Sequence, residues 1–129
     1  MGARLTIRID FPGQRRVGPG KIRLLELIDE TGSISAAGRA MTMSYRRAWL
    51  LVESLNTSFR RPVVGTRSGG RRGGGAHLTP FGRELIARYR TMEREVVAAT
   101  EKHVGAIEAA LADDQRTHAP AAAPITRRS

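Results

Sequence analysis

The sequence predicts a mainly α-helical fold with a small β wing, a winged helix-turn-helix that continues into a long C-terminal helix. Residues 21–59 hold three amphipathic segments, separated first by a glycine and then by a two-residue turn. The β-prone stretches on either side of the sequence SGGRRGGG predict a two-stranded wing with a glycine-rich tip. Helical spacing then continues from Phe81 to about Ala112, which predicts the long last helix.

Positive charge is concentrated in the middle of the chain. The 129 residues include 22 Lys and Arg against 12 Asp and Glu, a formal net charge of +10. Residues 39–72 hold eight arginines and one acidic residue, Glu53, whereas residues 80–114 hold seven acidic and five basic residues. Such a patch attracts polyanions, whether a DNA duplex, an anionic membrane or an acidic protein. The alternative is an ordinary solvated surface.

The N-terminal part alternates polar and apolar residues over Arg4–Ile9, which predicts a half-buried strand. The Phe11-Pro12-Gly13 sequence ends that strand, and residues 13–20 are expected to form a loop. A first helix is predicted over residues 21–30, because its isoleucines and leucines share one face and Gly32 provides a natural stop.

Two serines mark the starts of the next two helices. Ser33 is a favoured N-cap for a helix over residues 34–41. After the turn at Thr42 and Met43, Ser44 caps a third helix that runs to about Phe59. Apolar residues in this third helix recur at spacings of four and three, which predicts a buried stripe on one face. The stripe consists of Ala48, Val52, Leu55 and Phe59.

A β-hairpin wing is predicted after Pro62, which ends the helical region. Its strands are expected in residues 63–67 and 77–79, joined by the glycine-rich residues 68–75. Thr79 then caps the last helix, with Pro80 in the first helical position, which is a favoured arrangement.

The long last helix carries an apolar stripe with the spacing of a coiled coil. A helix of this length is difficult to stabilise alone, so we expect a homodimer; packing back onto its own domain is the alternative. The chain is expected to divide into a winged helix-turn-helix domain at 1–79, a dimerisation helix at 80–112 and a disordered tail at 113–129. The stripe contains Leu85, Tyr89, Met92, Val96 and Ala99, and after a shift in register Val104, Ile107 and Leu111.

The third helix exposes polar residues in its first turns, where a helix-turn-helix reads base edges in the major groove of double-stranded DNA. Arginine donates two hydrogen bonds to guanine, so Arg46 is the expected base contact, while Arg47 is expected on bases or phosphates. Trp49 either faces the DNA or packs in the core. Arginines of the wing are expected to neutralise phosphates or to enter the minor groove, unless the tip makes no contact. The predicted DNA-binding residues are Ser33, Ser44, Tyr45, Arg46, Arg47, Trp49, Arg67, Arg71 and Arg72.

Other kinds of chemistry find no support in the sequence. The chain has no cysteine, and its histidines, His77, His103 and His118, are scattered, so neither a metal site nor a catalytic set is expected. No nucleotide-binding glycine motif occurs, and no cofactor is expected. Without such sites, the protein is not expected to be an enzyme. The sequence has no membrane-spanning apolar run and no signal-peptide core, which predicts a cytoplasmic protein.

Short motifs on the predicted helices and wing carry a resemblance to a known family. They are DETGSIS at residues 29–35, SYR at 44–46, AW at 48–49, TRSGG at 66–70 and GGGAHLT at 73–79. With Gly82, they make residues 4–110 resemble the N-terminal DNA-binding domain of the ModE family, bacterial molybdate-responsive transcription regulators. The LysR-type winged helix is more distantly similar. The resemblance implies a homodimer that binds an inverted-repeat operator.

The resemblance does not extend to the effector-binding part of the family. Full-length members carry a C-terminal oxyanion-binding module, and we expect this chain to lack it, so molybdate binding is not expected. Two other functions remain as alternatives. One is a non-specific architectural DNA-binding protein. The other is a protein-interaction module whose long helix pairs with a separately encoded effector-binding protein.

Overall fold

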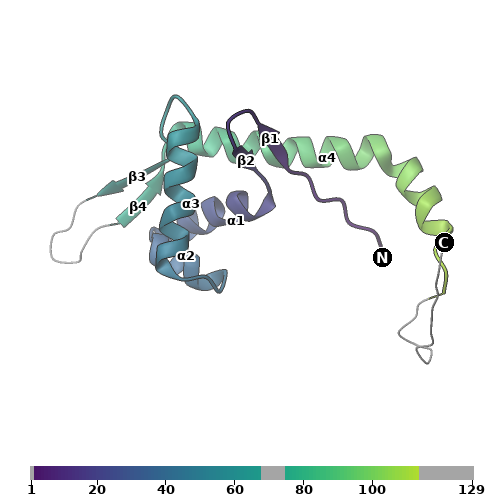
Figure 1. Cartoon of the computed structure of the whole chain (residues 1–129), viewed down its shortest axis with the longest axis horizontal. Coiled ribbons are helices and arrows are strands. Elements are labelled where there is room, and N and C mark those ends of the chain that lie inside the picture. The colour runs from purple at the N-terminus through teal and green to yellow at the C-terminus, as the bar shows by residue number, and fades with distance from the viewer. Residues whose placement is uncertain (1, 68–74, 114–129) are drawn as a thin grey trace.

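Three helices form the helix-turn-helix in the computed structural model, which describes residues 2–67 and 75–113. They are α1 (Pro19–Thr31), α2 (Ile34–Ala40) and α3 (Tyr45–Ser58). The wing consists of the antiparallel strands β3 (Val64–Arg67) and β4 (Gly75–Leu78), and α4 (Pro80–Ala109) follows it. In Figure 1 the wing extends to one side of α3 and α4 extends to the other. The predicted winged helix-turn-helix with a long C-terminal helix is confirmed.

One hydrophobic core joins the helices, the wing and the first half of α4. The predicted stripe of α3 lies in it, with Ala48, Val52 and Leu55 buried and Phe59 packed against it from a partly buried position. Tyr89 of α4 is 3% exposed, and its hydroxyl donates a hydrogen bond to the carbonyl of Ile7. The fully buried residues of α1 are Ile22, Leu24, Leu25 and Ile28.

The three predicted helix caps are present. The side-chain oxygens of Ser33, Ser44 and Thr79 each accept a hydrogen bond from the backbone amide three residues further on, at 3.0, 3.1 and 2.9 Å. Each cap satisfies one of the amides that a helix start leaves without a partner. Gly32 ends α1 with a φ of 71°, a conformation that glycine adopts without strain. The starts of α2, α3 and α4 and the end of α1 are therefore set by local chemistry.

The N-terminal region differs from its prediction. Residues 4–8 form no strand; instead β1 (Ile9–Phe11) pairs antiparallel with β2 (Arg15–Val17), inside the segment predicted to be a loop. A strand needs a neighbour with which to pair, and the tight turn at Gly13 and Gln14, both with positive φ, supplies one only to residues 9–11. The first helix also starts earlier than predicted, because Pro19 suits its first position.

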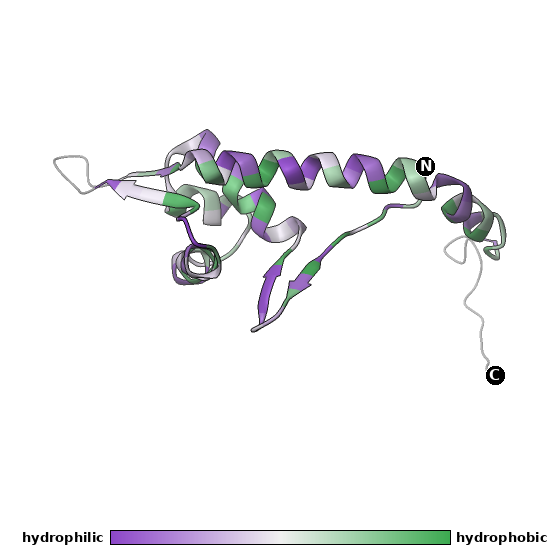
Figure 2. Cartoon of the chain, turned by 90° about the horizontal axis from the view of Figure 1, so that it is seen from above, coloured by the Kyte–Doolittle hydropathy of each residue, from purple (hydrophilic) through white to green (hydrophobic). Residues whose placement is uncertain are grey.

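The distal half of α4 lies away from the core. Val97 and Ile107, in the distal half of α4, and Leu111, just beyond its end, are 50%, 69% and 70% exposed. The N-terminal segment runs beside this part of the helix, where the amide of Ala3 donates a hydrogen bond to Glu108 at 3.1 Å (Figures 1 and 2). The helix ends at Ala109, three residues before the predicted end. Most of the tail predicted to be disordered, residues 114–129, lies outside the described residues.

Candidate nucleic-acid interface

The outer face of α3 is exposed and carries large side chains. Tyr45, Trp49 and Leu50 are 53%, 40% and 55% exposed, and Arg46 is exposed between them. Of the two possibilities left open for Trp49, packing in the core is therefore wrong. The core face of α3 is taken by smaller residues, and Trp49 lies about a quarter turn away from Ala48.

A cleft between the first turns of α2 and α3 and the tip-side ends of β3 and β4 brings three predicted site residues together. Ser33, Tyr45 and Arg67 line it, and its volume is about 270 Å³. Ser35 and Thr66 also line it and add hydroxyl groups. Backbone amides and hydroxyls at a helix start, next to an arginine, form a surface that suits a phosphate.

Asn56 fixes the position of the wing relative to α3. Its side-chain oxygen accepts hydrogen bonds from the amides of Val63 and Val64, at 2.7 and 3.0 Å, and its amide group donates to the carbonyl of Val64 at 3.0 Å. On the other strand, the amide of Ala76 donates to the carbonyl of Gly32 at 2.9 Å. The wing is thus tied both to α3 and to the turn between α1 and α2.

The arginines of this face have no acidic partners. Within residues 2–67 and 75–113, Arg46, Arg47 and Arg67 take part in no ion pair, whereas Arg23 of α1 and most arginines of α4 pair with carboxylates. Arginines without counter-charges produce a field that attracts a polyanion, and they are free to donate hydrogen bonds to it. The interface is therefore electrostatically prepared for an anionic partner.

The other predicted site residues fall into three groups. Ser44 caps α3, and its oxygen accepts from the amide of Arg47 at 3.1 Å, so this hydroxyl is partly occupied by the cap. Arg47 lies on the opposite flank of α3 from the wing cleft, in a groove shared with the start of α1 and with β2. Arg71 and Arg72 lie outside the described residues.

Sequence reasoning missed three residues of this face. Leu50 is exposed one helical turn after Arg46, a spacing that would have identified it. Thr66 lines the wing cleft beside Arg67. No pattern in the sequence identifies Asn56, because its partners come from a strand that folds back onto α3.

The described part of the chain offers few other sites. None of its helices combines the length and the apolar character that a bilayer crossing requires. Among the same residues, no three acidic or histidine side chains gather as potential metal ligands.

Comparisons with known proteins give this domain relatives. A molybdenum transport protein ModE from Azotobacter vinelandii is 40% identical over 82 residues, which cover 64% of this chain and 30% of that protein. A molybdenum-pterin-binding protein MopB from Rhodobacter capsulatus is 47% identical over 81 residues, 63% of this chain and 30% of that protein. The DNA-binding transcriptional dual regulator ModE of Escherichia coli K12 is 33% identical over 89 residues, 69% of this chain and 34% of that protein. Over these residues the chain is similar to proteins of the ModE family.

The similarity to these relatives covers only part of their length. The chain spans about a third of the length of the curated ModE and Mop relatives that it matches. No family model matches the chain. Among solved structures, a LysR family transcriptional regulator is 17% identical with a TM-score of 0.48, over 64% of this chain and 27% of that chain.

Proposed function

We propose that this ModE-like domain binds double-stranded DNA in a sequence-specific manner and regulates transcription. The observation that carries the proposal is the exposed face of α3, where Arg46 has no acidic partner among the described residues and lies next to the cleft that Ser33, Tyr45 and Arg67 line. Proteins named transcriptional regulators among its relatives, from Yersinia pestis and Escherichia coli, support it. A regulatory rather than an enzymatic role follows.

In this proposal, Arg46 reads a guanine in the major groove, with Tyr45 and Trp49 beside it on base or sugar edges. Ser33, Ser44 and Arg67 hold phosphates, and Arg71 and Arg72 extend the phosphate contacts from the wing tip. Arg47 acts on phosphates rather than bases, because it lies on the far flank of α3.

We further propose that the protein binds an inverted-repeat operator as a homodimer through the long helix. The exposed side chains of Val97, Ile107 and Leu111 would be covered by the second copy. A two-fold dimer places two recognition helices about 34 Å apart, one turn of DNA, which explains why a symmetric operator is expected. Domain boundaries at 79/80 and 112/113 belong to the same proposal.

Selection of bound sites from a pool of random duplexes tests the proposal. Recovery of a palindromic site supports a sequence-specific dimer. Equal binding to all sequences with a steep salt dependence would instead indicate an architectural DNA-binding protein. Absence of salt-dependent binding would favour a protein-interaction module that pairs with a separate effector-binding chain. The molybdenum and pterin in the relatives' names are properties of those longer proteins, of which the matched residues cover about a third.

The dimer is tested by the mass of the chain in solution. Light scattering after size exclusion is expected to give twice the chain mass of 14.1 kDa, and Ile107→Glu is expected to shift it towards the monomer. A monomer for the unchanged protein at micromolar concentration would remove the dimer from the proposal while leaving DNA binding in place.

A further inference from the structure

A groove on the second flank of α3 is lined by four cations, of which only Arg47 belongs to the predicted DNA-binding residues. It has a volume of about 480 Å³ and lies between the N-terminal hairpin, the start of α1 and one side of α3. Its cationic lining residues are Arg8, Arg16, Lys21 and Arg47, and its apolar ones include Met41, Met43 and Leu51.

The positive charge of this groove is only partly balanced. Arg8 and Arg16 share one carboxylate, that of Asp10, at 2.9 and 3.3 Å. Lys21 has no acidic partner in the described residues; its ammonium donates to the carbonyl of Arg16 at 2.9 Å and to Ser54 at 3.4 Å. Burial lowers the pKa of Lys21, and the nearby positive charge of Arg16 lowers it further, so these two cations repel each other. An anion in the groove would relieve that repulsion.

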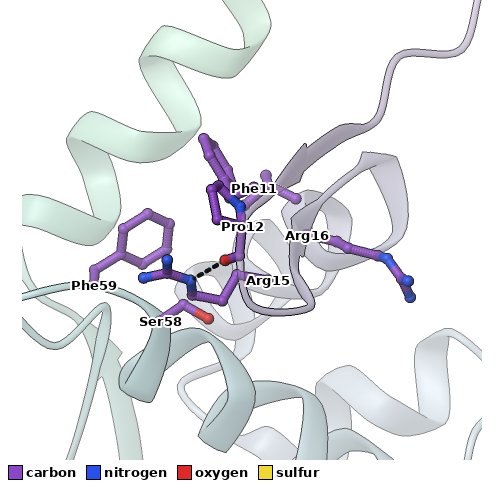
Figure 3. Close-up of a pocket in the computed structure, with 7 residues that line it drawn as sticks. Phe11, Pro12, Arg15, Arg16, Ser58 and Phe59 are labelled. Atoms are coloured by element: carbon purple, nitrogen blue, oxygen red, sulfur yellow. Dashed lines mark hydrogen bonds between the residues drawn. The ribbon is translucent and has the colours of Figure 1, made fainter.

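The position of the groove relative to the wing indicates which anion fits. α3, vertical in Figure 1 and viewed end-on in Figure 2, lies between the wing and the β1–β2 hairpin in both views. Figure 3 shows Arg15 turned back to the carbonyl of Pro12, while Arg16 extends from the opposite side of β2, away from Phe59. The hairpin therefore offers Arg16 to the groove and uses Arg15 for its own turn.

The dimensions of DNA connect these two flanks. The major groove is about 12 Å wide, and a helix with its side chains is about 10–12 Å across. A recognition helix in that groove has one phosphate backbone on each side. The wing cleft with Arg67 lies on one side of α3, and the four cations of the second groove lie on the other.

We propose that the N-terminal hairpin is a second phosphate clamp, which holds the DNA backbone on the opposite side of the major groove from the wing. Arg8, Arg16, Lys21 and Arg47 are its phosphate-binding residues, and the apolar floor of the groove accommodates the adjacent sugars. The inference rests on the proposed DNA binding and adds the hairpin to the residues that perform it.

Salt dependence of binding tests the clamp, with the duplex recovered by site selection as the probe. Arg16→Gln is expected to reduce the slope of log affinity against log salt by about 1, the value for one lost phosphate contact. The fall in affinity between 50 and 200 mM salt should then be about fourfold smaller than for the unchanged protein. Arg8→Gln is a second variant with the same expected result. Arg88→Gln on α4 is the matched control, since Arg88 is also exposed and paired with one carboxylate, and its slope should not change.

Ethylation of individual phosphates locates the contact. Interference should disappear at phosphates of one strand in Arg16→Gln and at phosphates of the other strand in Arg67→Gln. An unchanged slope for Arg16→Gln and Arg8→Gln would overturn the clamp and favour an acidic protein segment as the occupant of the groove. Loss of the same phosphates in both variants would overturn it as well. If the unchanged protein binds no duplex, the proposed function itself fails, which is a separate result.

Discussion

Arginines on the two sides of this molecule have different surroundings. Between α1 and α4, Arg90 donates hydrogen bonds to Glu26 at 2.8 and 2.9 Å and to Glu93 at 2.7 Å. On the outer face of α3 and the wing, Arg46 and Arg67 have no ion-pair partner among the described residues. The first kind of arginine holds two helices of the same chain together. The second kind leaves its charge available to another molecule, and composition alone does not separate the two.

Loss of Arg90 is expected to have the largest effect on stability. Arg90→Met leaves Glu26, which is 22% exposed, without its two strongest hydrogen bonds, and should lower the free energy of unfolding by about 3 kcal/mol. Denaturant unfolding measures it. Arg90→Lys keeps the charge but not the paired geometry and should give a smaller loss. The salt slope of DNA binding should stay the same; a change there would mean that the two groups of arginines are not separate.

Replacement of Arg46 should weaken DNA binding and leave stability unchanged, the opposite of the pattern expected for Arg90. Arg46→Ala is expected to weaken binding to the selected duplex by about 2 kcal/mol and to relax sequence preference at one base pair. Thermal stability should not change, because the side chain is exposed and unpaired. Competition with duplexes that carry single base changes measures the preference. Uniform weakening across all duplexes would make Arg46 a phosphate contact instead.

Asn56 is an uncharged residue that links stability and DNA binding, because it holds the wing on α3. Asn56→Ala leaves the amides of Val63 and Val64 without partners and should lower stability by about 1.5 kcal/mol, measured by denaturant unfolding. Asn56→Asp retains both acceptor bonds and is the matched control, with a smaller loss expected. Equal stability of all three proteins would show that the wing holds its position without Asn56.

The smallest expected effect is a loss of folding stability at acidic pH. Hydrogen bonds from Arg90 lower the pKa of Glu26, and burial opposes them. A carboxyl whose pKa is lower in the folded state stabilises the protein above its ordinary value of 4.5 and loses that contribution as the pH falls through the lowered pKa. Thermal unfolding between pH 7 and pH 3 should show this loss in the unchanged protein and a weaker one in Arg90→Met. Parallel curves for the two proteins would assign the acid dependence to other carboxylates.

Local patterns in the sequence predicted much of the fold. Ser33, Ser44 and Thr79 are N-caps as expected, because a cap forms with an amide only three residues away. The apolar stripe of α3 was predicted for the same reason, since its period is fixed by helix geometry. The prediction of a strand at residues 4–9 was wrong because a strand also needs a neighbouring strand to pair with. Here β2 pairs only with residues 9–11.

The candidate site was likewise predicted only in part from the sequence. Its residue types and the exposed start of α3 are properties of the sequence, and so is the ModE-like set of motifs. The tertiary structure decided that Trp49 lies outside the core, that Asn56 joins α3 to the wing, and that Arg47 belongs with the N-terminal hairpin. These relations join residues far apart in the chain, so no local period or spacing encodes them. The sequence by itself determined where helices start and which face of each is apolar; packing between elements determined which arginines find carboxylates and which remain available to a partner.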